Sequence, residues 1–184
     1  MLIDVDDCQL VLVDYQARLM PSIHEAGRVL ANAERLGKAA QLLDVPVWGT
    51  EENPAGLGEN APEVRALCER TLVKMSFSAC ADGLVEWLRP APARQGGNAR
   101  SLPKHLQKAA PQAEDGRATV VIAGCETHVC LMQTALELLE AEFDVVVVTD
   151  ACSSRTERNR DAAFDRLAGA GAELVTTEMV AFEW

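Results

Sequence analysis

The sequence predicts an α/β protein with a doubly wound, mostly parallel six-stranded sheet and helices on both faces. Short runs rich in Val, Ile and Leu alternate with longer segments that have helical spacing of apolar residues. The strand runs are continuously apolar, which is typical of strands that are covered on both faces in a parallel sheet. Such sheets bind ligands at the carboxyl ends of their strands. We therefore expect functional residues just after the strands.

The first half of the chain predicts three strands and three helices. The run QLVLVD at 9–14 is the first strand, and PVWGT at 46–50 is the second. Between them lies a helix at 23–43, because Val29, Ala33, Leu36 and Ala40 recur at helical spacing. A short helix at 63–68 precedes the third strand, LVKM at 72–75, and another helix follows at 79–88.

The second half predicts three more strands and two more helices. TVVIAG at 119–124 is the fourth strand, and a helix follows at 128–142. DVVVVT at 144–149 is the fifth strand, a helix occupies 156–170, and 173–176 is the sixth strand. With 184 residues, the chain has the length of a single domain spanning 1–184.

The segment 89–117 interrupts the alternation of strands and helices. It is rich in Pro and Gly, and it carries Arg89, Arg94, Arg100, Lys104 and Lys108 before its first acid. A solvated surface insertion is one interpretation of this composition. The other is a basic lid over a substrate that bears a carboxylate.

The charge balance excludes several classes of partner. Lys and Arg number 17 against 28 Asp and Glu, so the net charge is −11, which opposes binding to nucleic acid or an anionic membrane. No apolar run approaches the roughly 20 residues that span a bilayer. The first residues, MLIDVDDCQL, lack the features of a signal peptide. We therefore expect a cytoplasmic location.

The six cysteines and three histidines are scattered along the sequence. No two cysteines have the C-x-x-C spacing of zinc sites, and the histidines lie far apart at 24, 105 and 128. We expect neither a metal nor another cofactor.

Three residues at the ends of predicted strands form a candidate nucleophilic site: Asp14, Lys74 and Cys130. Each also has a simpler interpretation, since Asp14 could cap a helix, Lys74 could face water on an edge strand, and Cys130 could pack a helix onto the sheet. If Thr127 is the helix N-cap, Cys130 lies in the first turn. There the helix dipole favours a thiolate, and free N–H groups can hold an oxyanion.

Several ordered motifs resemble the isochorismatase-like cysteine hydrolase superfamily, which includes nicotinamidases and carbamoylsarcosine amidohydrolases. The motifs are LVDYQ, TEENPAGLG, KMSFSAC, AGCETHVCLMQTALELLE and VVVVTDACSSR. TEENPAGLG and VVVVTDACSSR are similar to the subgroup of isochorismatase-domain-containing proteins. The resemblance implies a Rossmann-like hydrolase fold, a homo-oligomer, and a final helix that follows TTEMVAFEW.

The resemblance also implies roles for individual residues. The family's catalytic Asp, Lys and Cys correspond to Asp14, Lys74 and Cys130. A cis peptide bond corresponds to Cys125–Glu126, and the N–H groups of Glu126 and Cys130 would form the oxyanion hole. Substrate contacts are expected from Gln16, Glu51 and Thr127. Nicotinamidases hold a metal with an Asp and two His after the second strand, but WGTEENPAGLGENAPE has no histidine, so no metal ligands are expected.

Two functional hypotheses follow. The first is a metal-independent cysteine hydrolase that acts on a small amide or carbamoyl C–N bond through a Cys130 thioester. Isochorismatases that cleave a vinyl ether lack this cysteine, so Cys130 argues against that reaction. The alternative is a weakly active or inactive family member that serves as a binding or scaffold protein. In both cases the expected partners are a small molecule and further copies of the chain.

Overall fold

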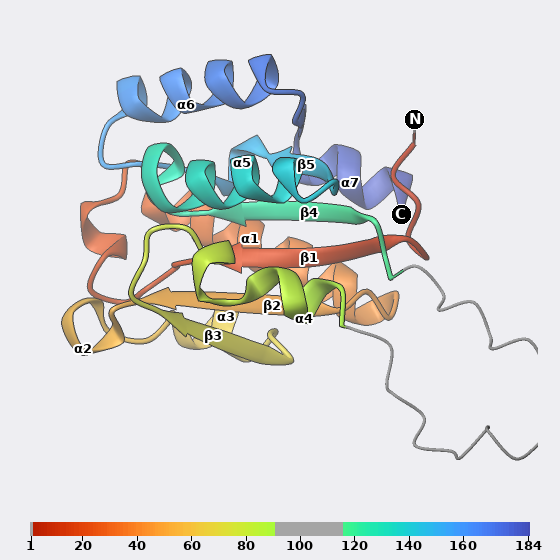
Figure 1. The fold of residues 1–184 in the computed structure, drawn as a ribbon. Coiled ribbons are helices and arrows are strands. Elements are labelled where there is room, and N and C mark those ends of the chain that lie inside the picture. Colours follow the sequence, from red (N-terminus) through yellow and green to blue (C-terminus); the bar gives the residue numbers. More distant parts are fainter. Residues whose placement is uncertain (1, 91–115) are drawn as a thin grey trace, which may run out of the picture.

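The computed structural model describes residues 2–90 and 116–184. Its core is a six-stranded sheet in the order β3-β2-β1-β4-β5-β6, and every neighbouring pair is parallel (Figure 1). The predicted doubly wound fold is confirmed, and the sheet is wholly parallel. The strands are β1 (Cys8–Val13), β2 (Val47–Glu52), β3 (Arg70–Lys74), β4 (Thr119–Gly124), β5 (Asp144–Val148) and β6 (Glu173–Val175).

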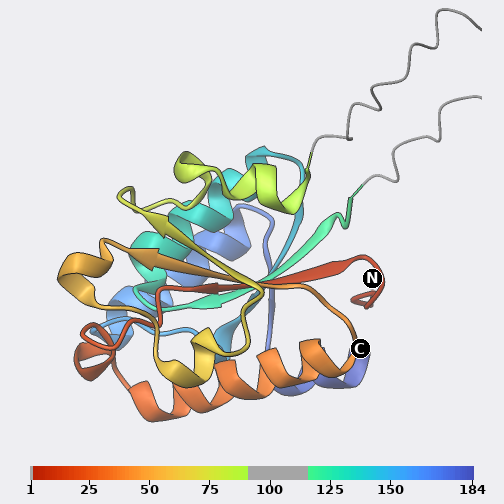
Figure 2. The same ribbon diagram turned by 90° about the horizontal axis from the view of Figure 1, so that it is seen from below.

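Helices cover both faces of the sheet. One face carries α1 (Ala26–Leu42), α3 (Pro62–Arg65) and α7 (Thr177–Glu183), and the other carries α4 (Leu84–Leu88) and α5 (Met132–Glu140) (Figure 2). The helix α6 (Glu157–Gly169) packs against α5 and β6. No helix in the described part of the chain has the length and apolarity that a bilayer crossing needs.

The core is built from aliphatic side chains on the strands and on the inner faces of the helices. All six residues of β1 are buried, as are the last five of β4. Continuous burial explains why these strands appear as unbroken apolar runs in the sequence. The order of the strands reverses between β1 and β4, so their carboxyl ends form the edge where a parallel sheet binds ligands.

Several short elements were not expected from the sequence. They are α2 (Pro54–Leu57), the 3-10 helices η1 (Met20–Ser22), η2 (Cys80–Asp82) and η6 (Thr149–Ala151), and the π-helix η5 (Thr127–Leu131). The helix expected at 79–88 is divided into η2 and α4 by Gly83, whose φ is 99°. The segment TTEMVAFEW, expected to precede a final helix, itself contains α7.

Most of the basic insertion at 89–117 lies outside the described residues, so neither interpretation of it is tested. Its two described ends bond to the body of the domain. Arg89 donates to the carbonyl oxygens of Ala141 and Glu142, and Arg117 donates to those of Val5 and Cys8. Arg117 precedes β4 and bonds to the first residue of β1, so this attachment lies at the amino end of the sheet, opposite the carboxyl ends of the strands.

Candidate active site

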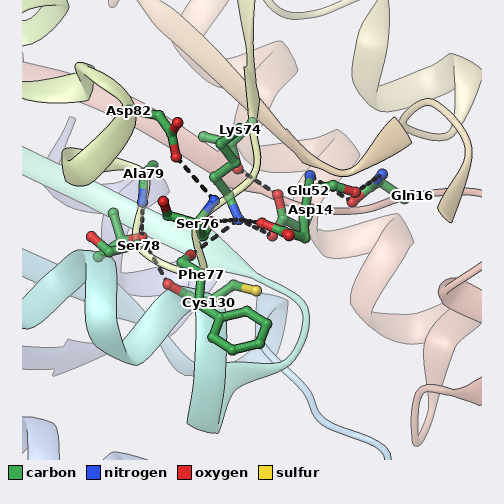
Figure 3. Close-up of polar contacts among 12 residues, drawn as sticks. Asp14, Gln16, Glu52, Lys74, Ser76, Phe77, Ser78, Ala79, Asp82 and Cys130 are labelled. Carbon is green, nitrogen blue, oxygen red and sulfur yellow. Dashed lines mark hydrogen bonds and ion pairs between the residues drawn. The ribbon is translucent and has the colours of Figure 1, made fainter. Parts of the chain in front are cut away.

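Asp14, Lys74 and Cys130 converge at the carboxyl edge of the sheet (Figure 3). Asp14 directly follows β1, where its φ of 54° turns the chain sharply out of the strand. Lys74 is the last residue of β3, and Cys130 lies in η5, which follows β4. Three elements that are distant in the sequence therefore present a carboxylate, an ammonium and a thiol to one site.

Asp14 and Lys74 form a buried ion pair. The distance from Lys74 Nζ to Asp14 Oδ2 is 2.8 Å, and neither side chain has any exposed surface. The other carboxylate oxygen, Oδ1, accepts a hydrogen bond of 2.7 Å from Thr50 Oγ1. Burial lowers the pKa of Lys74, but the charge and hydrogen bonding of Asp14 outweigh it, so the pKa lies above its usual value and the lysine is charged.

Lys74 also has partners besides Asp14. Its Nζ lies 2.9 Å from Glu52 Oε2 and donates to the carbonyl oxygens of Ser76 at 3.2 Å and Phe77 at 3.0 Å. The loop after β3 is held in turn by Asp82, which accepts from the Ser76 N–H. Figure 3 shows the ammonium surrounded by these oxygens. Their number explains how a lysine is tolerated at the buried end of a strand.

The thiol of Cys130 is neutral at rest. Burial raises its pKa far above the usual thiol value, the negative charge of Asp14 raises it further, and Lys74 opposes these effects only in part. The sequence-based expectation that the start of the helix favours a thiolate is therefore wrong for the resting site, because desolvation and a facing carboxylate outweigh the dipole. A reaction at this sulfur would therefore need a base to take the proton.

A pocket of about 410 Å³ opens over these residues. Asp14, Glu52 and Cys130 contribute to its wall, together with Phe77, whose ring lies beside the Cys130 sulfur in Figure 3. The remaining lining residues are Arg18, Leu19, Ser22, Leu57, Glu126, Val129 and Arg155. The pocket has the size of a small-molecule site.

The turn into η5 differs from the one that the resemblance implied. The Cys125–Glu126 peptide bond is trans, and residues 2–90 and 116–184 contain no cis bond, so the expected cis bond is corrected here. Glu126 instead takes a left-handed conformation, with φ 53° and ψ 56°, and this turns the chain from β4 into the helix. The N-cap is therefore Glu126, one residue earlier than the expected Thr127.

The three residues expected to contact substrate line a different region. Gln16 and Thr127 are fully buried, Glu51 is buried near the end of β2, and none of the three lines the pocket. Gln16 bonds to both backbone groups of Glu52, and Glu51 accepts from the Asn60 N–H at 2.7 Å. Gln16 and Glu51 thus hold the backbone around the pocket without lining it.

Glu52 lines the pocket, whereas the sequence predicts a substrate contact from its neighbour Glu51. Alternation along β2 sends the two side chains to opposite sides, and Glu52 faces the pocket. In the sheet, Glu52 pairs with Lys74 across β2 and β3, and this pairing brings its side chain to the site. Within the described residues, no three His, Cys, Asp or Glu side chains gather as candidate metal ligands.

Comparison with known proteins agrees with this architecture. The model of the isochorismatase domain matches residues 105–179. Isochorismatase domain-containing protein 2A of Mus musculus is 37% identical over 172 residues, which cover 92% of this chain and 70% of that protein.

Three solved structures share the whole fold. MAR1 ribonuclease from Caenorhabditis elegans has a TM-score of 0.81 and 27% identity, with 100% of this chain and 83% of that chain covered. The YcaC gene product of Escherichia coli, an octameric hydrolase of unknown specificity, has a TM-score of 0.78, 28% identity and coverages of 98% and 80%. YcaC from Pseudomonas aeruginosa, with hexane-2,5-diol and covalent acrylamide, has a TM-score of 0.77, 25% identity and coverages of 98% and 81%. The chain described here belongs to the isochorismatase-domain family of hydrolases.

Proposed function

We propose that this chain is a metal-independent cysteine hydrolase that cleaves the C–N bond of a small amide or carbamoyl compound through a thioester on Cys130. The observation that carries the proposal is the buried Asp14–Lys74 pair, of which Asp14 lines the same pocket as Cys130. A carboxylate, a fixed positive charge and a protonated thiol are the parts that base-assisted nucleophilic attack needs.

In the acylation step, Asp14 takes the proton of Cys130 as the sulfur attacks the carbonyl carbon. The oxyanion that forms is held by backbone N–H groups in the first turn of η5, where Cys130 lies. Lys74 keeps its charge throughout and stabilises the ionised Asp14 before the transfer. The protonated Asp14 then gives its proton to the leaving nitrogen, and the C–N bond breaks.

In the deacylation step, a water molecule replaces the amine in the pocket. Asp14, again ionised, accepts a proton from this water as its oxygen attacks the thioester carbonyl. The C–S bond breaks, the acid product leaves, and the proton returns to the sulfur. One carboxylate thus serves as base and acid in turn, as microscopic reversibility requires.

Three arguments favour a nucleophilic cysteine over the alternatives. Acrylamide is an electrophile that adds to thiols, and the structure of YcaC from Pseudomonas aeruginosa contains it in covalent form. A scaffold protein would have no need of a buried ion pair beside a thiol, since burying charges costs stability. The net charge of −11 opposes binding of the RNA that a ribonuclease would cleave.

The test is a screen for ammonia release from nicotinamide, short aliphatic amides and ureido compounds, with a single-stranded RNA as a negative control. We expect at least one amide or ureido compound to be turned over by the natural chain, and Cys130→Ala to fold normally without turnover. Chelation by EDTA is expected to leave the rate unchanged. Turnover by Cys130→Ala at the natural rate would contradict the covalent mechanism. Loss of activity when EDTA removes a stoichiometric metal would contradict metal independence.

We also propose that the chain forms a homo-oligomer, in the cytoplasm as its sequence predicts. The strand β3 lies at the edge of the sheet, and Val73, Met75 and Phe77 along and after it are 56%, 69% and 55% exposed. Such an apolar edge is a site for association, and the E. coli YcaC product is octameric. Light scattering at micromolar concentration should give a multiple of 19.9 kDa, and a mass of one chain would contradict the proposal.

A further inference from the structure

Two carboxylates in the active-site pocket share one ammonium. Asp14 and Glu52 both lie within 3 Å of Lys74 Nζ, at 2.8 Å and 2.9 Å. With Cys130 protonated, this group of three carries one net negative charge. Asp14 is required as the proton acceptor in the proposed mechanism, whereas Glu52 has no step in it. The second carboxylate therefore needs its own explanation.

The position of Glu52 is tightly fixed by its neighbours. Its backbone N–H donates to Gln16 Oε1, and its carbonyl oxygen accepts from Gln16 Nε2, both at 2.9 Å. Its side chain is 12% exposed and lines the pocket together with Asp14 and Cys130. In Figure 3 its carboxylate points to the Lys74 ammonium, as that of Asp14 does.

Only one of the two Glu52 oxygens is engaged. Oε2 contacts Lys74, while Oε1 has no hydrogen-bond partner among the described residues. A carboxylate oxygen accepts hydrogen bonds and cannot donate when it is ionised. In this pocket it can therefore bind N–H or O–H groups of a ligand, and the net negative charge around Lys74 disfavours an anionic group at the same point.

We propose that Glu52 is a specificity-determining residue that accepts a hydrogen bond from the amide N–H of the substrate. The substrate class is then an unsubstituted carboxamide or ureido compound, because its nitrogen carries hydrogens that point away from the attacked carbonyl. This inference rests on the proposed amide hydrolysis at Cys130. It separates the roles of the two carboxylates: Asp14 moves the proton, and Glu52 orients the leaving nitrogen.

The inference can be tested without knowing the natural substrate. Acrylamide has two N–H hydrogens, and N,N-dimethylacrylamide has none. In both reactions Cys130 Sγ bonds to the terminal carbon, the C=C bond becomes single, and the thiol proton ends on the carbon next to the carbonyl. Peptide mass spectrometry gives the rate of adduct formation at Cys130, and each rate is divided by the rate with glutathione to remove intrinsic reactivity.

The informative variant is Glu52→Gln. The glutamine oxygen can still accept from Lys74, which leaves the NH₂ group facing the pocket, so the acceptor for the substrate is replaced by a donor. We expect the normalised preference of the natural chain for acrylamide to be at least about ten-fold and to vanish in Glu52→Gln, since one hydrogen bond to a charged group accounts for such a factor. Glu51→Gln is the matched control, because Glu51 faces away from the pocket, and it should keep the preference.

A pH profile checks that Glu52→Gln retains the local structure. The charge of Glu52 contributes to the raised pKa of Cys130, so its removal should shift alkylation by both probes to lower pH by the same amount. The preference for acrylamide and the pH shift of alkylation are therefore separate measurements. A preference that persists in Glu52→Gln would show that pocket size discriminates between the probes. That result would overturn the role of Glu52 and leave the proposed Cys130 nucleophile untouched. Absence of any Cys130 adduct with either probe would overturn the proposed nucleophile as well.

Discussion

In the proposed mechanism, single residues at the carboxyl edge of the sheet decide which proton moves. Asp14 is fully buried and adjacent to the thiol, and its charge is a major cause of the raised pKa of Cys130. The sequence identified Asp14, Lys74 and Cys130 because each follows or ends a strand. It could not separate Glu51 from Glu52, because the side of an extended segment that faces the pocket is set by pairing with β3, not by residue type.

Asp14→Asn should separate electrostatics from proton transfer. The amide can keep the hydrogen bond from Thr50 but accepts no proton, so we expect kcat on a turned-over amide to fall by about 10²–10⁴-fold. The pKa of Cys130 should fall in the same variant, because a negative charge that raises it is gone. Thiol alkylation followed against pH gives the second result. Unchanged kcat would show that Asp14 is not the base.

Lys74→Met should expose the cost of two buried carboxylates without a counter-charge. We expect the free energy of unfolding to fall by about 3–5 kcal/mol in urea titrations. Lys38→Met is the control, because Lys38 pairs with Glu34 on the exposed surface of α1, and its loss should cost about 0.3–0.5 kcal/mol. Equal losses in the two variants would mean that the ion pair at the site has no special role in stability.

At the scale of elements, the sequence located the strands well and the turns poorly. The limits of β4 are those expected, since the apolar run has clear ends at Thr119 and Gly124. The π-helix η5 and the left-handed Glu126 were missed, because CETHVC has no glycine to mark a positive φ and no sequence pattern distinguishes a π-turn from an α-helix. Tertiary contacts determine both features.

The contact between β1 and β4 sets the spacing between Asp14 and Cys130. Gly124 faces Val13 across the two strands, and a Cβ on Gly124 would lie 2.5 Å from the Val13 carbonyl oxygen. Gly124→Ala should therefore push the strands apart, lower the free energy of unfolding by about 1–3 kcal/mol, and reduce kcat. Gly169→Ala, at the end of α6 with no atom within 4 Å of the new Cβ, is the control and should not destabilise. Equal melting temperatures of Gly124→Ala and Gly169→Ala would contradict a close approach of β1 and β4 at Gly124.

For the whole molecule, the parallel fold was predictable because apolar runs and helices alternate through most of the chain. The interior also contains several of the six cysteine thiols. Cys8, Cys125 and Cys152 are buried, and burial is the first cause of the raised pKa of each, to about 11 for Cys8 and about 12 for Cys152. Each of them stays protonated in the folded chain above the pH at which it ionises in the unfolded chain.

The free energy of unfolding should therefore decrease as the pH rises above about 9. In this range the unfolded chain loses thiol protons that the folded chain keeps, so each such thiol lowers stability by up to about 1.4 kcal/mol per pH unit. The raised pKa of Lys74 acts in the same direction above its usual value of 10.5. Guanidinium titrations in reductant at pH 8, 9.5 and 11 measure the slope, and Cys152→Ala should make it shallower. A stability that is constant from pH 8 to 11 would contradict the burial of these thiols.

Identifying the atom that becomes acylated during turnover tests the Cys130 thioester most directly. An amide found in the ammonia-release screen is mixed with the natural chain, the reaction is quenched in acid within seconds, and the peptides are analysed by mass spectrometry. The proposed mechanism predicts an acyl adduct on Cys130, absent from the peptides that carry the other five cysteines and absent in Cys130→Ala. Steady turnover with no adduct at any time, or with the adduct on another residue, would contradict it.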